Sequence, residues 1–455
     1  MEKNISKYID EKKDELINLS KKIWENPEIS FEEYNAAKWF GEFLEKEGFE
    51  VKIGDYGVPT SIRASFGSGK PVIGFLGEYD ALRGMSQVVS THKEAVKEGA
   101  PGHACQHNLL GVAHLGAAIA LKNEIEKNNL NGTVVFYGCP GEEELTGKGF
   151  MARGGAFKDL DISFSWHPGN VNGILLGKLT ALNTFEIHYK GTTAHAAADP
   201  QNGRSALDAL ELTNVGVQYL REHVTNDVRI HYSILDGGKA PNIVPDTASS
   251  WYFVRALSRE TVVDIYERIK KIAKGAAMMT ETEVEVKYLG GCYNTMPNKV
   301  IADVLLESMN EIPKQEWSES DKDFAKKMEK EKANKGSYAS DDKNNIALYE
   351  GEVIVSNSDS YGSSDVGDVH HICPGIFFLT ATTNIGAAGH SWQNTACAGM
   401  DIGFKGMIYA AKSMALSGLK FMKNKELVDK AKKDFEKDMM GKEYICPITE
   451  ELEIK

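Results

Sequence analysis

Short apolar runs that alternate with helical stretches constrain the fold of this chain more than any other feature. The runs lie at 72–76, 133–137, 162–166, 353–355 and 375–379. Their length and composition suit buried strands, and helical periodicity follows at about 110–126 and about 398–420. Strands separated by helices predict an α/β sheet whose ligand site lies at the carboxyl ends of its strands.

Residues 178–291 have a different pattern of apolar and polar residues. Alternating apolar and polar residues and two helical patterns give the order β-α-β-β-α-β, which is typical of an antiparallel sheet with helices on one face. We therefore predict two domains. A mixed-sheet α/β catalytic domain comprises residues 1–177 and 292–455, and an α+β domain of ferredoxin-like topology is inserted at 178–291. An exposed sheet edge in the inserted domain favours dimerisation.

The remaining segments are predicted to be peripheral. Residues 4–48 show two helical patterns interrupted at Pro27. Residues 316–343 are dense in charged side chains and predict a solvated helix and loop, and the charged tail at 423–455 is expected on the surface.

Composition excludes several classes of function. The chain has 455 residues and a net charge of −13, which argues against a nucleic-acid-binding protein but leaves room for an anionic substrate held by a local arginine. It contains no apolar run of the ~18 residues needed to span a bilayer. Six scattered cysteines and the absence of a signal-peptide pattern predict a cytoplasmic protein with free thiols.

The motif at 102–108 offers metal-ligand chemistry. Cys105 and His107 are separated by one residue, so in an extended segment both side chains would point the same way and could converge on one ion or an adjacent pair. By itself such a motif is more often a buried thiol beside a partly exposed histidine than a metal site.

Further candidate ligands stand at other strand ends. Glu142 and Glu143 follow a Pro-Gly turn after the second strand, so that one could bind a metal while its neighbour moves a proton. His167 ends the third strand, and His390 follows a glycine-rich loop. Each has an ordinary alternative, a helix N-terminus for the acidic run or a backbone-bonded histidine. Their shared position at strand ends favours a metal centre.

Seven sequence words carry a family resemblance. They are 26–33 (NPEISFEE), 76–82 (LGEYDAL), 102–109 (GHACQHNL), 140–143 (PGEE), 191–197 (GTTAHAA), 364–369 (SDVGDV) and 390–392 (HSW). With these words, residues 20–415 resemble the aminoacylase-like zinc metallopeptidase family, in the branch of hippurate hydrolase and plant auxin-conjugate amidohydrolases.

The resemblance implies a two-metal centre and assigns roles to single residues. Five ligands of two divalent ions, zinc or manganese with cobalt as an alternative, would be Cys105, His107, Glu143, His167 and His390, with Cys105 bridging. Glu142 would be the general base. In the inserted domain, His195 would polarise the scissile carbonyl, often across a dimer, while Asn242 and Arg255 would engage the substrate's amide and free carboxylate.

The activity implied is metal-dependent hydrolysis of N-acyl or N-aroyl amino acids, with p-aminobenzoyl-glutamate as the implied substrate. A dipeptidase or an aminoacylase for another acyl group remains an alternative, as does a non-catalytic metal-binding subunit, although Glu142 and every ligand are present. The expected assembly is a homodimer or a pair with a homologous subunit. The sequence departs from the branch at Asn108, where many members have Asp, and at Glu144 and Leu145, which replace a glycine-rich stretch.

Overall fold

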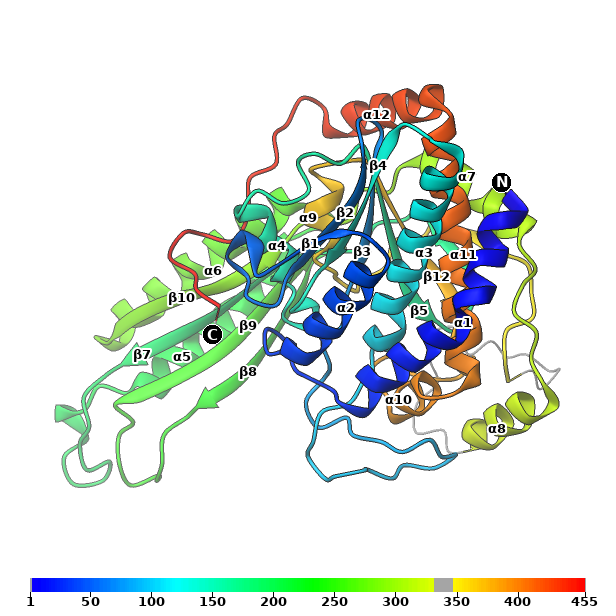
Figure 1. Ribbon diagram of the computed structural model, residues 1–455. Helices are drawn as coiled ribbons and strands as arrows, with labels where there is room; N and C mark the ends of the chain where they lie inside the picture. The colour runs from blue at the N-terminus through cyan, green and yellow to red at the C-terminus, as the bar shows by residue number, and fades with distance from the viewer. Residues whose placement is uncertain (1, 331–346, 455) are drawn as a thin grey trace.

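A mixed eight-stranded sheet forms the centre of the larger domain in the computed structural model, which describes residues 2–330 and 347–454 (Figure 1). Its order is β1-β2-β4-β3-β5-β12-β6-β11. The strands are β1 (Glu50–Ile53), β2 (Ile62–Ser68), β3 (Val72–Gly77), β4 (Gly132–Gly138), β5 (Ile162–Gly169), β6 (Gly173–Leu175), β11 (Ile354–Ser356) and β12 (Gly375–Ala381). The central strands β4, β3, β5 and β12 are parallel to one another, so their carboxyl ends meet at one edge.

The apolar runs became buried strands because both faces of this part of the sheet are covered. All six residues of β3 are buried, for example. The expected α/β class is therefore confirmed. The sequence patterns did not reveal β1, which is largely exposed at the sheet edge, its partly buried neighbour β2, or β6, which has three residues. Periodicity needs longer and more regularly buried segments than these.

Helices cover the sheet in layers. Helix α3 packs against β3, β4 and the two helices α1 and α11, so it is buried on nearly all sides and has no polar face. The helices of this domain are α1 (Glu2–Glu25), α2 (Tyr34–Lys46), α3 (His107–Asn128), α4 (Gly147–Arg153), α7 (Lys299–Glu311), α8 (Glu319–Lys330), α9 (Val366–His370), α10 (Trp392–Ala398), α11 (Asp401–Lys423) and α12 (Lys425–Met439). The break expected at Pro27 separates α1 from α2.

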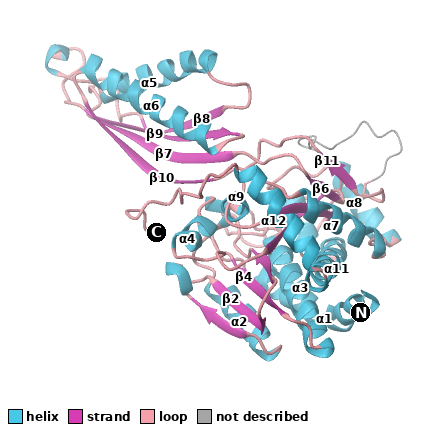
Figure 2. Cartoon of the chain, turned by 90° about the horizontal axis from the view of Figure 1, so that it is seen from above, coloured by secondary structure: helices cyan, strands magenta, loops and turns pink. Residues whose placement is uncertain are grey.

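The inserted segment forms a second sheet with its own core. Its elements are β7 (Ala181–Lys190), α5 (Ala206–Leu220), β8 (Arg229–Asp236), β9 (Thr247–Ala256), α6 (Arg259–Thr280) and β10 (Glu283–Cys292). All neighbouring strands are antiparallel in the order β10-β7-β9-β8, and both helices lie on one face (Figure 2). Ser205 and Ser258 cap the two helices by accepting backbone N–H groups. The β-α-β-β-α-β order predicted from the sequence is confirmed.

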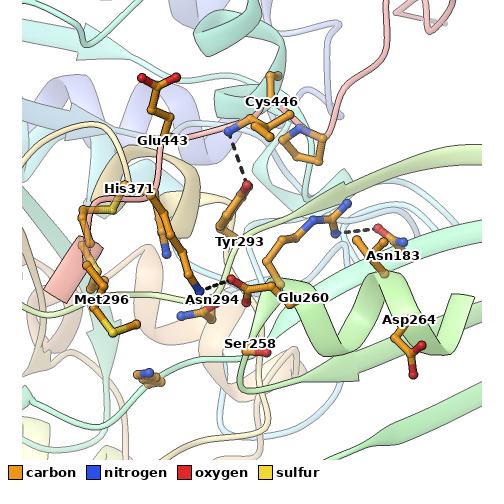
Figure 3. Close-up of a pocket in the computed structure, with 18 of the residues that line it drawn as sticks. Asn183, Ser258, Glu260, Asp264, Tyr293, Asn294, Met296, His371, Glu443 and Cys446 are labelled. Carbon is orange, nitrogen blue, oxygen red and sulfur yellow. Dashed lines mark hydrogen bonds and ion pairs between the residues drawn. The ribbon is translucent and has the colours of Figure 1, made fainter.

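Two segments that were expected on the surface are partly buried. In α8, Ala325 and Met328 pack into a small apolar cluster, while residues 331–343 of the expected loop lie outside the described residues. The part of the tail that follows α12 crosses the junction of the two domains, and Ile448 is buried there. Figure 3 shows part of this junction, which contains a cavity of about 1500 Å³ between α6 and the tail. In this cavity the Tyr293 hydroxyl accepts a hydrogen bond from the backbone N–H of Ile445. The high density of charged residues predicted a fully exposed position for both segments, but only one face of each segment is solvated.

Among the described residues, no helix combines the length and the apolar composition that crossing a bilayer requires.

Candidate metal centre and active site

The carboxyl ends of four strands deliver the candidate side chains to one place. Glu78 and Asp80 follow β3, and Glu142 and Glu143 follow β4 in a single 3-10 turn. His167 belongs to the end of β5. His390 lies beyond β12, and Cys105 and His107 lie at the start of α3. The chain thus brings together all five candidate ligands and Glu142.

Cys105 and His107 converge through a turn, not through the extended segment that their spacing had suggested. Gln106 between them has a φ of 62°, in the left-handed region, and His107 begins α3. The Gln106 side chain fixes this turn, because it donates to the Asn394 carbonyl at 2.8 Å and accepts from the Thr382 hydroxyl at 2.6 Å. A strained residue tied down on both sides is typical of a functional site.

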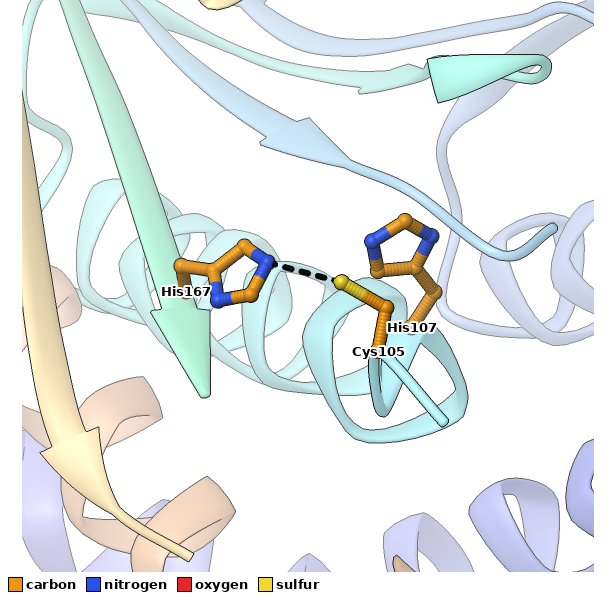
Figure 4. Close-up of side chains that lie close together, drawn as sticks. All are labelled: Cys105, His107 and His167. Atoms are coloured by element: carbon orange, nitrogen blue, oxygen red, sulfur yellow. Dashed lines mark hydrogen bonds between the residues drawn. The ribbon is translucent and has the colours of Figure 1, made fainter. Parts of the chain in front are cut away.

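Two groups of three ligand atoms share Cys105. One joins Cys105, His107 and His167, with the thiol sulfur 3.2 Å from His167 Nε2 (Figure 4). The other joins Cys105, Glu143 and His390, and here Glu143 lies 3.7 Å from His390 Nε2. Within each group the ligand atoms lie within 4.8 Å of one another. This is the arrangement expected of two adjacent ions bridged by one thiolate.

Hydrogen bonds on the far side of each ring direct the inner nitrogen into the site. His107 Nδ1 is 2.8 Å from Asp80, and His167 Nδ1 is 2.7 Å from the Pro168 carbonyl, so each Nδ1 donates and each Nε2 faces the site. His107 Nε2 and Glu143 Oε1 are buried and make no hydrogen bond to any described residue. Glu78 Oε2 is 3.4 Å from His107 Nε2 without the alignment of a hydrogen bond. Unpaired buried acceptors of these types fit divalent metal ions.

The electrostatics of the site also favour cations. Burial, and next the charge of Glu78, raise the pKa of Glu142 well above its usual range. Burial raises the pKa of Glu143 to about 7, and burial followed by Glu143 raises the pKa of the Cys105 thiol. A divalent ion would reverse these shifts, because its charge favours carboxylates and the thiolate. Among the described residues of this site, Lys148 is the permanently charged cation, held 2.5 Å from Glu78 and 2.5 Å from Asp365.

Residues of the 26–33 sequence word form hydrogen bonds that hold the residues around the site in position. Ser30 donates to Asp80 Oδ2 at 2.8 Å, and the same oxygen accepts the backbone N–H of Glu143 at 2.9 Å. Buried Glu33 accepts the N–H of Gly141, which begins the turn that carries the two glutamates. Sequence reasoning assigned no role to Ser30 or Glu33. Their position inside the 26–33 word was the available signal, but the partners are 50 and 108 residues away in the chain.

The two departures from the branch pattern have local explanations. The Asn108 amide donates to the Ser20 hydroxyl and to the Ala398 carbonyl, each at 3.0 Å, which ties α3 to α1 and α10 and which a carboxylate could not do. Leu145 takes a φ of 56°, the left-handed conformation that glycine would adopt more easily. Holding a leucine in this conformation has a local cost of about 1–3 kcal/mol.

The candidate residues of the inserted domain separate into two places. His195 and Asn242 lie in neighbouring loops beyond β7 and between β8 and β9, where Ala196 N–H donates to the Asn242 carbonyl. Figure 1 shows the end of β7 at the tip that is remote from the larger domain. Arg255 is at the opposite end of the sheet, and its guanidinium donates to the Ser363 hydroxyl at 2.8 Å. The structure therefore does not bring Asn242 and Arg255 together within one chain.

Comparisons with known proteins agree with this architecture. Residues 179–279 match the peptidase dimerisation domain. The chain is 36% identical to a subunit of the p-aminobenzoyl-glutamate hydrolase of Escherichia coli, over 95% of this chain and 94% of that protein. It is 28% identical to the Xaa-Arg dipeptidase of Mus musculus, over 96% and 92%.

A solved structure shares the fold. It is a dinuclear metal-binding peptidase of the M20 family from Bacillus subtilis, with a TM-score of 0.63 and 20% identity over 90% of this chain and 98% of that one. Together with the long match to the Escherichia coli hydrolase, these findings confirm the resemblance seen in the sequence words. The chain belongs to the M20 family of peptidases and amidohydrolases, the aminoacylase-like family that its motifs indicate.

Proposed function

We propose that this protein is a metal-dependent amidohydrolase that cleaves the amide bond of N-acyl or N-aroyl amino acids, with a p-aminobenzoyl-glutamate-like substrate. The observation that carries this proposal is the pair of ligand groups that share Cys105, with Glu142 placed against His107 but outside both groups. The long match to a p-aminobenzoyl-glutamate hydrolase supports the substrate class.

The candidate residues would have distinct roles in metal binding, proton transfer and substrate binding. Two divalent ions, zinc or manganese with cobalt as an alternative, would activate a water molecule and polarise the scissile carbonyl when bound to Cys105, His107, Glu143, His167 and His390. Glu142 would accept the proton of that water and pass it to the leaving amine. Arg255 would pair with the free carboxylate of the substrate, which fixes the position of its amide bond.

His195 and Asn242 would reach the centre from a second chain. Their distance from the ligands within one chain and their common loop cluster support an arrangement in which the inserted domain pairs two chains. The second chain would be another copy or a homologous subunit, since the Escherichia coli relative is itself named as one subunit of its enzyme. The six free cysteines support a reducing, cytoplasmic location.

Complementation tests this arrangement. His195→Ala chains and Glu142→Gln chains should each be nearly inactive, and mixing them should restore up to about a quarter of the activity if the chains reassort at random, since one site in a mixed dimer then has both residues. The measurement is turnover after verified subunit exchange, with exchange between two Glu142→Gln preparations as the control. No recovery in the verified mixed dimer would show that His195 acts within its own chain.

The bridging position of Cys105 is tested by metal content. Cys105→Ala removes the sulfur that belongs to both ligand groups, so the affinity for both ions should fall. The bound metal should then be less than one ion per chain after dialysis. Elemental analysis measures this, and Cys139→Ala, which changes a buried thiol outside the site, is the control. Retention of two ions in Cys105→Ala would contradict a bridging thiolate.

A substrate panel decides between the amidohydrolase and a dipeptidase. Release of free amine should be fastest from N-aroyl amino acids in the presence of added Mn²⁺ or Zn²⁺ and absent after chelation. Faster cleavage of unblocked dipeptides would favour the second candidate, which the match to a dipeptidase supports. No release from either class would contradict the proposed function.

A further inference from the structure

The inserted sheet has one face that its helices leave uncovered, and this face carries an unusual pair of arginines. Arg229 on β8 and Arg255 on β9 are directly opposite in the antiparallel register, so both side chains project from the same face. Like charges in opposite positions destabilise a sheet. His231 is two residues along the same strand, and its pKa is lowered by burial first and then by these two arginines and Arg221.

In the described part of the chain, neither arginine of this pair forms a salt bridge. Among the described residues, no acidic group lies within 4.0 Å of the guanidinium of Arg229 or Arg255. The charge of Asp227 interacts with Arg229, but the Asp227 carboxylate is hydrogen bonded to the backbone N–H of Leu257. In a chain with a net charge of −13, two adjacent unpaired guanidinium groups are a local exception that an anion would compensate.

Aromatic rings hold both guanidinium groups in position. Arg255 lies over the ring of Phe253 at 5.5 Å, and Arg229 lies over the ring of Tyr361 at 4.2 Å. Arg229 also donates to the Asn226 and Val228 carbonyls through one nitrogen, Nη1. A guanidinium group has five N–H donors, so the donors on the other two nitrogens of Arg229 remain for a carboxylate.

The pair faces the catalytic domain. Tyr361 and the Ser363 hydroxyl that binds Arg255 belong to the loop before α9. Two residues further on, Asp365 binds Lys148, which in turn binds Glu78 next to His107. These contacts connect the arginines, through the loop before α9 and Lys148, to the residues around the candidate ligand His107.

We propose that Arg229 is a specificity residue which binds a second carboxylate, so that the enzyme selects N-acyl amino acids with an acidic side chain. This inference rests on the proposed function. Arg255 would bind the α-carboxylate and Arg229 the side-chain carboxylate. The Cβ atoms of directly opposite residues are about 4.5–5.5 Å apart, which is comparable to the spacing of the two carboxylates in a dicarboxylic amino acid.

The test compares paired ligands that differ in one charge. N-benzoyl-glutamate and N-benzoyl-glutamine have nearly the same shape, so the ratio of their kcat/KM values reports recognition of the side-chain carboxylate. The wild-type ratio should be on the order of 10 to 100. Arg229→Met should bring the ratio close to one, and Arg229→Lys should give an intermediate value because it keeps the charge and loses the planar fork. Arg255→Met should lower kcat/KM for both substrates and keep the ratio above one.

Arg268→Met is the matched control, because Arg268 lies on α6 and bonds the His223 carbonyl away from the uncovered face; its ratio should equal that of the wild type. A wild-type ratio near one, or an unchanged ratio in Arg229→Met, would overturn the proposal.

Calorimetric binding of the same two ligands to the Glu142→Gln variant separates the proposed subsite from the proposed hydrolytic function. Discrimination that is lost with Arg229 would support the subsite even if the protein hydrolysed neither ligand, whereas equal binding would exclude it.

Discussion

Glu142→Gln should reduce turnover by about 10²–10⁴-fold while both metal ions are retained. The carboxylate is buried beside His107 and lies outside both ligand groups that share Cys105, so its loss removes a proton acceptor and no shared ligand. Glutamine has the same shape and cannot accept the proton of a water molecule. Steady-state kinetics and elemental analysis of the same preparation measure the two quantities.

The neighbouring residue provides the control for this substitution. Glu144 belongs to the same turn, but its side chain is exposed, so Glu144→Gln should keep turnover within about twofold of the wild type. Loss of metal in Glu142→Gln would point instead to the third possible ligand group, which contains Glu78, His107 and Glu142. Normal turnover would remove Glu142 from the reaction.

Some of this structure could be predicted from the sequence, because strand-end position is a local property. The apolar runs before Glu142 and His167 placed both residues at the same edge of a parallel sheet, where the structure has them. The order of elements in the inserted domain was visible for the same reason. Periodicity and the chemistry at the ends of strands needed no knowledge of tertiary contacts.

The remainder depended on contacts between distant segments. Nothing local reveals that Gln106 adopts a left-handed conformation held by Thr382 and Asn394, or that Asn242 and Arg255 occupy opposite ends of a sheet. Most of β9 lies between these two residues, so a spacing that looked like a pair in sequence spans the domain. Lys148 was not identified for a similar reason, since its two partners are 70 and 217 residues away.

Lys148→Met should lower the free energy of unfolding by about 3–5 kcal/mol. The Lys148 side chain is fully buried, and its ammonium lies 2.5 Å from Glu78 and 2.5 Å from Asp365, which are buried as well. Although burial lowers the pKa of Lys148, Asp365 and Glu78 raise it well above its usual range, so the lysine is charged. Its removal would leave two buried carboxylates without a cation. Urea unfolding measures the change, and Lys327→Met, which breaks an exposed pair with Asp323, should cost less than about 1 kcal/mol.

The same substitution should also change the pH dependence of catalysis. Burial and then the charges of Glu78 and Asp365 raise the pKa of Glu142, and Lys148 lowers it. Without the lysine the pKa of Glu142 rises further, so a higher pH is needed to obtain the deprotonated base, and the acidic limb of the kcat profile should move to higher pH. Lys148→Arg keeps the positive charge and should move that limb less than Lys148→Met does. A lysine that served only to fill the core would lower stability in both variants and leave the position of the acidic limb unchanged, so the pH profile separates an electrostatic role next to the general base from a packing role.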